Sequence, residues 1–201
     1  MKIIASLLGA VLLSGCTATY KAAELTDKFS DPSGPKIIAM QGNSIDFHDP
    51  MGSVKPGELD AFVARERATN RPSFAGFFYQ RIASGTSLVF SGEPKWLSIR
   101  AGDEAVFIAD GARIVLKATG GDIDSRVRRG VGYSVESEYM DSAQFIGTVE
   151  DLRRIAEAKT IEFKISGLNG AVSYPRQGRQ FLESFHPNIR QFYSAEVAPY
   201  R

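Results

Sequence analysis

The chain has one cysteine, Cys16, and it lies three positions after the end of a short apolar run close to the N-terminus. The run covers residues 3–13 and is preceded by the positive charge of Lys2. A helix that crosses a bilayer needs about 20 apolar residues, so a run of this length indicates the central part of an export signal. With no second cysteine, the rest of the chain forms no intramolecular disulfide, and its own core must stabilise the fold.

The residues at the end of the run, Leu13-Ser14-Gly15-Cys16, resemble the bacterial lipobox, Leu-[Ala/Ser]-[Gly/Ala]-Cys, at every position. The resemblance to a bacterial lipoprotein implies that residues 1–15 are a signal peptide cleaved after Gly15. It also implies that Cys16 carries diacylglycerol, often with an acyl chain such as palmitate on the new amine. Two or three acyl chains make attachment to a membrane stable, whereas a single chain gives only marginal binding. The alternative is an ordinary signal peptide followed by a chance cysteine.

The residue after the cysteine bears on location within the cell envelope. In Gram-negative lipoproteins an Asp at that position commonly signals retention in the inner membrane, and this chain has Thr17 there. The resemblance therefore favours the outer membrane, facing the periplasm, if the source is Gram-negative. We expect residues 16–35 to be the lipidated cysteine and a tether, and residues 36–201 to form one globular domain, a size typical of single domains. The alternative for the tether is that Leu25 and Phe29 already pack on the domain.

The charge balance narrows the range of partners. Lys2 is the only charged residue of the leader, so its removal takes the formal charge from +1 to zero. A neutral chain is unlike the strongly basic domains that bind nucleic acids, and we expect no nucleic-acid partner. The expected partners are the membrane, through the N-terminal lipid, and an envelope protein, lipid or glycan.

Turn signals and alternating patterns predict an α+β fold, mainly an antiparallel β-sheet that is sandwich-like or strongly curved. Asp110-Gly111 lies between two apolar runs, and Asp-Gly favours a two-residue type I′ hairpin. Asn169-Gly170 is a second hairpin signal, preceded by a strand pattern at residues 161–165. Further strands are expected at residues 36–40, 44–47, 74–82, 96–99 and 133–139, with a break at Gly120-Gly121.

Three helices are expected, near residues 57–68, 149–158 and 179–193. Leu59, Phe62 and Val63 follow Pro56 at i, i+3, i+4 spacing, which predicts the first helix. Thr148 and Asp151 approximate a capping box at the start of the second. The third is predicted from apolar residues between positions 181 and 192. The expected core comprises Phe107, Ile114, Leu116, Tyr133, Val135, Leu152, Ile155, Ile161, Phe163, Ile165, Phe181 and Phe185, with Phe62, Phe77 and Ile99 as additions.

Candidate sites for chemistry are few. His48 lies beside Asp46, but no Gly-x-Ser-x-Gly elbow and no His-Glu-x-x-His motif is present, so we assign no catalytic residue, metal or cofactor. Arg126, Arg128, Arg129 and His48 are candidates for contacts with a ligand or with lipid headgroups. The alternative is a solvated loop for the three arginines and hydrogen bonding in a turn for His48. The aromatic run Phe74, Phe77, Phe78 and Tyr79 either lines a ligand cavity or belongs to the core.

These observations favour a lipid-anchored cell-envelope protein with a non-enzymatic binding or structural role. The alternative is an envelope hydrolase that acts on a lipid or polymer substrate and uses His48 or an unidentified pair of carboxylates.

Overall fold

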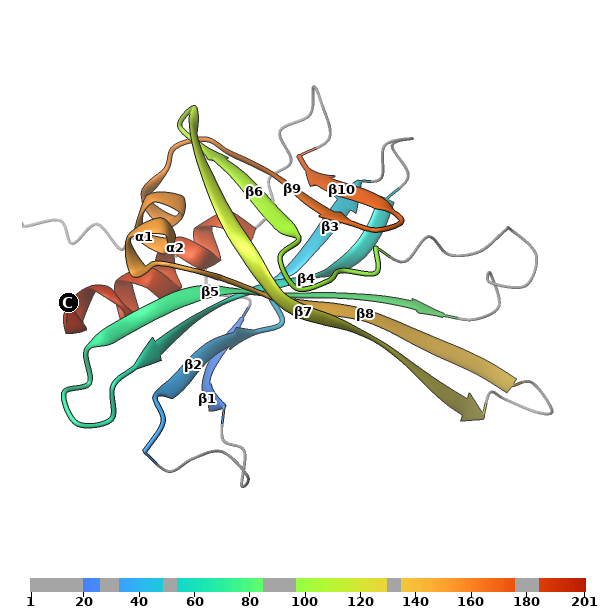
Figure 1. The fold of residues 1–201 in the computed structure, drawn as a ribbon, viewed down its shortest axis with the longest axis horizontal. Helices are drawn as coiled ribbons and strands as arrows, with labels where there is room; N and C mark the ends of the chain where they lie inside the picture. The colour runs from blue at the N-terminus through green and yellow to red at the C-terminus, as the bar shows by residue number, and fades with distance from the viewer. Residues whose placement is uncertain (1–19, 26–32, 49–53, 85–96, 130–134, 176–184) are drawn as a thin grey trace, which may run out of the picture.

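The computed structural model describes residues 20–25, 33–48, 54–84, 97–129, 135–175 and 185–201 (Figure 1). These residues form ten strands, two α-helices and one turn of 3-10 helix. The strands are β1 (Lys21–Leu25), β2 (Lys36–Gln41), β3 (Ser44–His48), β4 (Val54–Arg65), β5 (Pro72–Ser84), β6 (Glu104–Ala109), β7 (Ala112–Arg129), β8 (Val135–Gly147), β9 (Ile161–Gly167) and β10 (Gly170–Tyr174). The helices are α1 (Val149–Glu157), α2 (Phe185–Glu196) and η2 (Ala198–Tyr200).

Every strand pairing is antiparallel, and the pairings of eight strands return on themselves. They run from β4 through β5, β8, β7, β6, β9, β10 and β3 back to β4. β2 joins this cycle from outside by pairing with the end of β4, and β1 pairs with β2. Among the described strands, β1 is therefore the one with a single neighbour. The mainly antiparallel α+β fold that the sequence predicts is confirmed.

Aromatic rings fill the centre of the cycle of strands. The ring of Phe163 lies 5.2 Å from that of Phe107, 5.5 Å from that of Tyr174 and 5.7 Å from that of Phe185. All the expected core residues whose side chains the structure describes are buried. The side chains of Tyr133, Val135 and Phe181 lie outside the described residues. Alternation of buried and exposed positions along β9 produces this core, as the sequence pattern predicts.

The two helices lie against each other at one side of the sheet, over β4 and β5 (Figure 1). The last carbonyl groups of a helix have no hydrogen-bond partners within that helix. For α1, side chains of α2 supply these partners. His186 Nε2 lies 2.8 Å from the Ile155 carbonyl, and Arg190 donates to the Ala156 and Ala158 carbonyls at 3.1 and 2.8 Å. These bonds fix α1 to α2 and satisfy the end of α1.

The helix expected at residues 57–68 is wrong: this segment is the strand β4. Leu59, Ala61 and Val63 enter the main core, while Phe62 and Ala64 are buried on the opposite face. A strand covered on both faces has apolar residues on consecutive positions, and such a run also matches helical spacing. The apolar spacing alone therefore did not distinguish a helix from a strand that is buried on both faces.

The other two helices are found. α1 begins with the expected capping box, in which the Thr148 hydroxyl accepts the Asp151 N–H at 3.0 Å and the Asp151 carboxylate accepts the Thr148 N–H at 2.9 Å. α2 covers the second half of the region expected at residues 179–193, and the residues before Phe185 lie outside the described parts.

Both expected hairpins join adjacent antiparallel strands. Asp110 and Gly111 have φ angles of 48° and 80°, as a type I′ turn requires. The loop between β9 and β10 consists of Leu168 and Asn169, one position earlier than expected, because Gly170 pairs with Gly167.

Three local expectations differ from the structure. Leu97 to Ile99 are irregular rather than a strand, and their backbone bonds to residues 141, 168 and 169 instead of to a strand ladder. Gly120 does not end its strand: β7 continues past a register shift between Ala118 and Gly120. A bulge of this kind bends a strand without breaking its pairing. Arg126, Arg128 and Arg129 consequently lie in β7 rather than in a loop.

Part of the expected tether belongs to the fold. β1 pairs with β2 over five residues, and the ring of Tyr20, just before β1, packs edge-on against Phe192 of α2 with centroids 6.3 Å apart. The sequence Lys-Ala-Ala-Glu-Leu has little β-propensity, so the strand depends on its pairing with β2. In the described part of the chain, no helix is long and apolar enough to cross a membrane.

Candidate functional site

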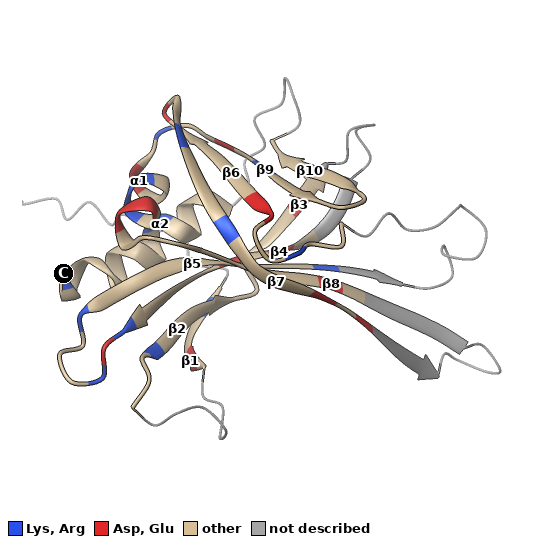
Figure 2. Cartoon of the chain, viewed as in Figure 1, with Lys and Arg blue, Asp and Glu red and all other residues tan. Residues whose placement is uncertain are grey.

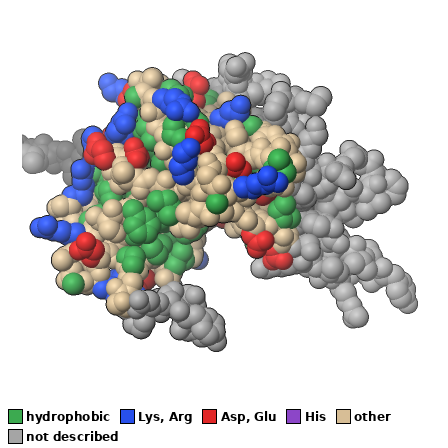
Figure 3. Space-filling model, viewed as in Figure 1, with side chains coloured by type: hydrophobic (Ala, Val, Ile, Leu, Met, Phe, Trp, Pro, Cys, Tyr) green, Lys and Arg blue, Asp and Glu red, His purple; other side chains and the backbone are tan. Residues whose placement is uncertain are grey.

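An open cleft lies between the β1–β2 pair and the outer face of β4, β5, β7 and β8, and we call it the β1–β2 groove. It has a volume of about 570 Å³. Figure 3 shows apolar side chains gathered on the face where these elements meet. The groove is lined by Leu25, Ala39, Met40, Gln41, Asp60, Phe78, Tyr79, Gln80, Thr119, Gly120, Gly121, Asp122, Met140, Ser142, Ala143 and Gln144.

Alternation along β5 divides the aromatic run that the sequence singled out. Phe77 and Tyr79 are buried in the core, whereas Phe74 and Phe78 are half-buried on the outer face. On that face Phe62 packs against Phe78 with ring centroids 4.6 Å apart. Phe77 and Tyr79 therefore belong to the core, as one interpretation of the run had it, while Phe78 lines an open groove.

Gly76 leaves room for the Phe62 ring, which packs against Phe78 of the groove. A Cβ atom on Gly76 would lie 2.9 Å from the Phe62 ring and even closer to the Phe145 carbonyl oxygen. Any larger residue at this position would displace the ring or the neighbouring strand. The position of Phe62, and with it that of Phe78, thus depends on Gly76.

Among the described residues that line the groove, the charged ones are both acidic: Asp60 of β4 and Asp122 of β7. Asp60 is 8% exposed, and its Oδ1 accepts the Asn43 N–H at 2.8 Å. Burial raises the pKa of the Asp60 carboxyl. Burial, followed by the charge of Asp60, also raises the pKa of Glu58, two residues earlier on the same strand. In Figure 2 acidic residues follow β7 beyond its crossing with β8. The end of the groove that β7 forms, which includes Asp122, is therefore acidic.

Two buried amide side chains, those of Asn43 and Asn188, hold the backbone on both sides of the contact between Asn43 and Asp60. Asn43, between β2 and β3, donates from Nδ2 to the Leu59 carbonyl at 3.0 Å, and Asn188 of α2 donates to Asn43 Oδ1 at 2.9 Å. Both amides are almost fully buried. Their bonds connect α2, β4 and the start of β3, and they fix one end of the groove.

A second polar cluster lies on the inner side of the same sheet. Asp141 of β8 is 1% exposed, accepts the Leu97 N–H at 2.9 Å and lies 4.0 Å from Arg81 Nη2 of β5. Burial raises the pKa of Asp141, although Arg81 opposes the shift. Burial and the Asp141 charge raise the pKa of the neighbouring Tyr79 hydroxyl. Neither Arg81 nor Asp141 lines the groove, so we assign this cluster to the attachment of residues 97–99 to the sheet.

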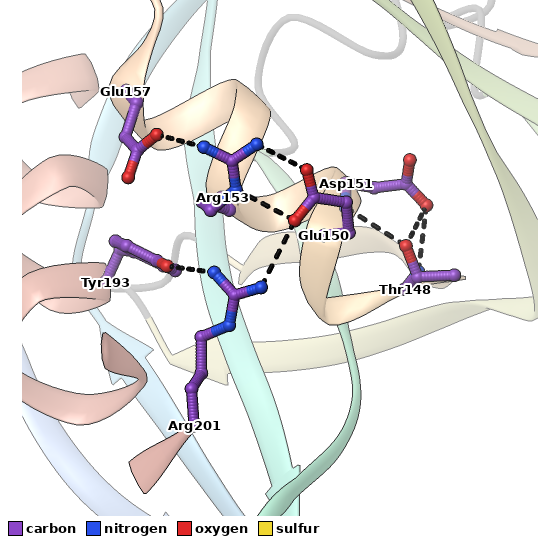
Figure 4. Close-up of polar contacts among 7 residues, drawn as sticks. All are labelled: Thr148, Glu150, Asp151, Arg153, Glu157, Tyr193 and Arg201. Carbon is purple, nitrogen blue, oxygen red and sulfur yellow. Dashed lines mark hydrogen bonds and ion pairs between the residues drawn. The ribbon is translucent and has the colours of Figure 1, made fainter. Parts of the chain in front are cut away.

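A third group is the ion-pair network at the ends of the helices (Figure 4). Arg153 binds Glu150 and Glu157, and Arg201 joins Glu150 at 3.3 Å to the Tyr193 hydroxyl at 3.0 Å. Arg153 lowers the pKa of Glu150. A smaller cleft of about 410 Å³ borders the network. Since exposed ion pairs are screened by water and stabilise little, the network is weak support for a specific site.

The residues that the sequence singled out are placed only in part. Cys16 lies outside the described residues. His48 ends β3, opposite Val54 and Ser173 in the register, and its side chain is outside the described parts. Arg126, Arg128 and Arg129 pair with Glu138, Glu136 and Val135 through their backbones, and their side chains are likewise not described. In the part of the chain that is described, no group of three or more potential metal ligands converges.

The groove itself was missed by the sequence reasoning. Asp60 was assigned to the helix expected at residues 57–68, and β1 was assigned to the tether, although β2 was expected as a strand. A usable signal was the two-residue spacing of Glu58 and Asp60, which places both carboxylates on one face of a strand.

The chain matches no protein-family model, no curated protein and no solved structure at a significant level. The site is therefore interpreted from its own geometry.

We expect Asp60→Asn to reduce the loss of stability that accompanies rising pH. The pKa of Asp60 is higher in the folded than in the unfolded chain, because burial disfavours the charged carboxylate. Above about pH 4 the unfolded chain therefore loses this proton while the folded chain still holds it, and the free energy of unfolding falls as pH rises. Asparagine does not titrate and keeps an oxygen for the Asn43 N–H. Urea unfolding between about pH 4 and pH 7 measures the effect, with Ser142→Ala of the same groove as the control. Equal slopes for wild type and Asp60→Asn would contradict the assignment.

Proposed function

We propose that this chain is a lipid-anchored cell-envelope protein that binds a partner, without catalysis, in the β1–β2 groove. The observation that carries the binding role is the groove, which combines a half-buried Phe78 with amide and hydroxyl side chains at its walls. Binding clefts typically have a mostly apolar surface and a few polar groups that orient the occupant. Asp60, the most buried acid of the groove, already accepts a backbone N–H, which suits a recognition role.

The anchor is proposed from the leader. Leu13-Ser14-Gly15-Cys16 supports lipidation of Cys16, and Thr17 supports outer-membrane placement in a Gram-negative source. Tyr20 packs on α2 only four residues after Cys16, so the folded domain begins almost at the proposed lipid.

Labelling of cells with a clickable fatty acid tests the anchor. We expect the wild-type protein to be labelled and to remain with membranes after washing at high salt, because several acyl chains hold it. Cys16→Ala should lose the label. Equal labelling of both proteins would disprove lipidation at this residue.

Photo-crosslinking in cells tests the groove. A photoreactive residue at Gln80 or Gln144, both in the groove lining, should give discrete adducts with a partner. The same residue at Glu162, exposed on β9 away from the groove, is the matched control. Adducts that are as abundant at Glu162 as at Gln80 would argue against the groove as the binding site.

A further inference from the structure

The free edge of β1 borders the groove. The cycle of pairings leaves every other described strand with two or more neighbours, so β1 is the described strand whose second edge makes no pairing. Unpaired N–H and C=O groups on an edge strand readily pair with another extended chain. Leu25, at the end of β1, lines the groove together with Asp122 and Met140 from the opposite wall. A strand added at this edge would consequently lie along the groove.

The side chains at this edge suit an apolar partner on one face. Leu25 is 40% exposed, one of the few large apolar side chains of the described residues with such exposure. Ala23 and the exposed Lys21 share the face of Leu25, because alternate residues of a strand point the same way. Alternate side chains of an added strand would therefore share the face of Leu25, which lines the groove with Phe78 and Met140.

The acidic charge of the groove determines which extended peptide segments it can bind favourably. The charged residues in the described part of its lining are Asp60 and Asp122, and both are acidic. A basic residue on the partner would complement them, while an acidic partner would be repelled. Charge complementarity thus favours a segment that combines apolar and basic residues.

We propose that the β1–β2 groove takes up an extended segment of a partner protein, which adds as a strand beside β1 and places apolar side chains on Phe78 and basic side chains near Asp60 and Asp122. The inference rests on the proposed binding function of the groove and names the chemistry of its partner. Main-chain hydrogen bonds would supply affinity, and the alternate side chains would supply specificity.

The test uses the full chain in mild detergent and a fluorescent peptide of alternating valine and lysine, about ten residues long, the upper end of common strand lengths. We expect saturable binding below about 1 mM by fluorescence anisotropy. Amide hydrogen exchange should slow within β1 when the peptide binds. The same peptide N-methylated at every residue should not bind, because it has no N–H groups to donate.

Charge variants separate the two parts of the proposal. Asp60→Asn combined with Asp122→Asn should weaken the binding of the valine–lysine peptide by about three- to tenfold at low salt. Glu162→Gln, an exposed acid outside the groove, should leave binding unchanged. A peptide with glutamate in place of lysine should bind weakly or not at all.

Three results would overturn the inference: no saturable binding of the valine–lysine peptide, equal binding of the glutamate peptide, or β1 amides that are already protected in a dimer of the chain. The last result would show that a second copy occupies the edge. Fatty-acid labelling at Cys16 and crosslinking at Gln80 could both succeed in any of these cases. The proposed function would then stand while this description of the partner fell.

Discussion

Replacing Asp141 with alanine is expected to lower the free energy of unfolding by about 3–5 kcal/mol, the cost of breaking a buried ion pair by removal of one partner. The Asp141 carboxylate is almost fully buried, accepts the Leu97 N–H and faces Arg81. The variant would leave the Arg81 guanidinium in the interior without this carboxylate and would release residues 97–99 from the sheet. Urea unfolding followed by circular dichroism measures the change.

A double variant is the matched control for this prediction. Replacing Asp141 and Arg81 together with leucine removes both charges, and exchange of a whole buried pair for apolar residues often costs little. We expect the double variant to be clearly more stable than Asp141→Ala. If the single variant unfolds at the wild-type urea concentration, the pair does not hold this part of the sheet.

Replacing Phe163 with alanine is expected to cost about 3–5 kcal/mol, the range for deletion of a buried phenylalanine. Phe163 lies 3% exposed on β9, and its ring contacts those of Phe47, Phe107, Tyr174 and Phe185. These four residues come from β3, β6, β10 and α2, so the cavity would lie where distant parts of the chain meet.

Phe74→Ala provides the comparison, because Phe74 is half-buried on the outer face and packs on Phe62 alone among the described ring contacts. It should cost much less than Phe163→Ala, since the burial removed is smaller. Thermal unfolding of the two variants decides the point. Equal losses of stability would mean that the aromatic cluster is not the centre of the core.

Local sequence signals predicted the parts of the fold that depend on neighbouring residues. The capping box of Thr148 and Asp151 defined the start of α1, and Asp110-Gly111 defined a hairpin through its two positive φ angles. β9 followed from alternation alone. In each case a few adjacent residues determine the backbone conformation, so no tertiary contact was needed to recognise it.

β4 was misread because its conformation depends on partners far away in the sequence. It pairs with β2 and β3 along one edge and with β5 along the other, and both of its faces are covered. β1 was missed for the related reason that its residues form a strand only beside β2. The groove combines these two elements with β5, β7 and β8, so it could not be predicted without the topology.

The packing of Tyr20 on α2 limits how far the proposed anchored form could travel from its membrane. Tyr20 lies four positions after Cys16, and a fully extended chain spans at most about 3.6 Å per position, or about 14 Å in total. Such a short connecting segment would confine the domain to a thin layer above the lipid headgroups. A partner anchored in the same bilayer would meet it in two dimensions, at a local concentration much higher than in free solution. Even a modest affinity for the groove would then be enough to keep the two together.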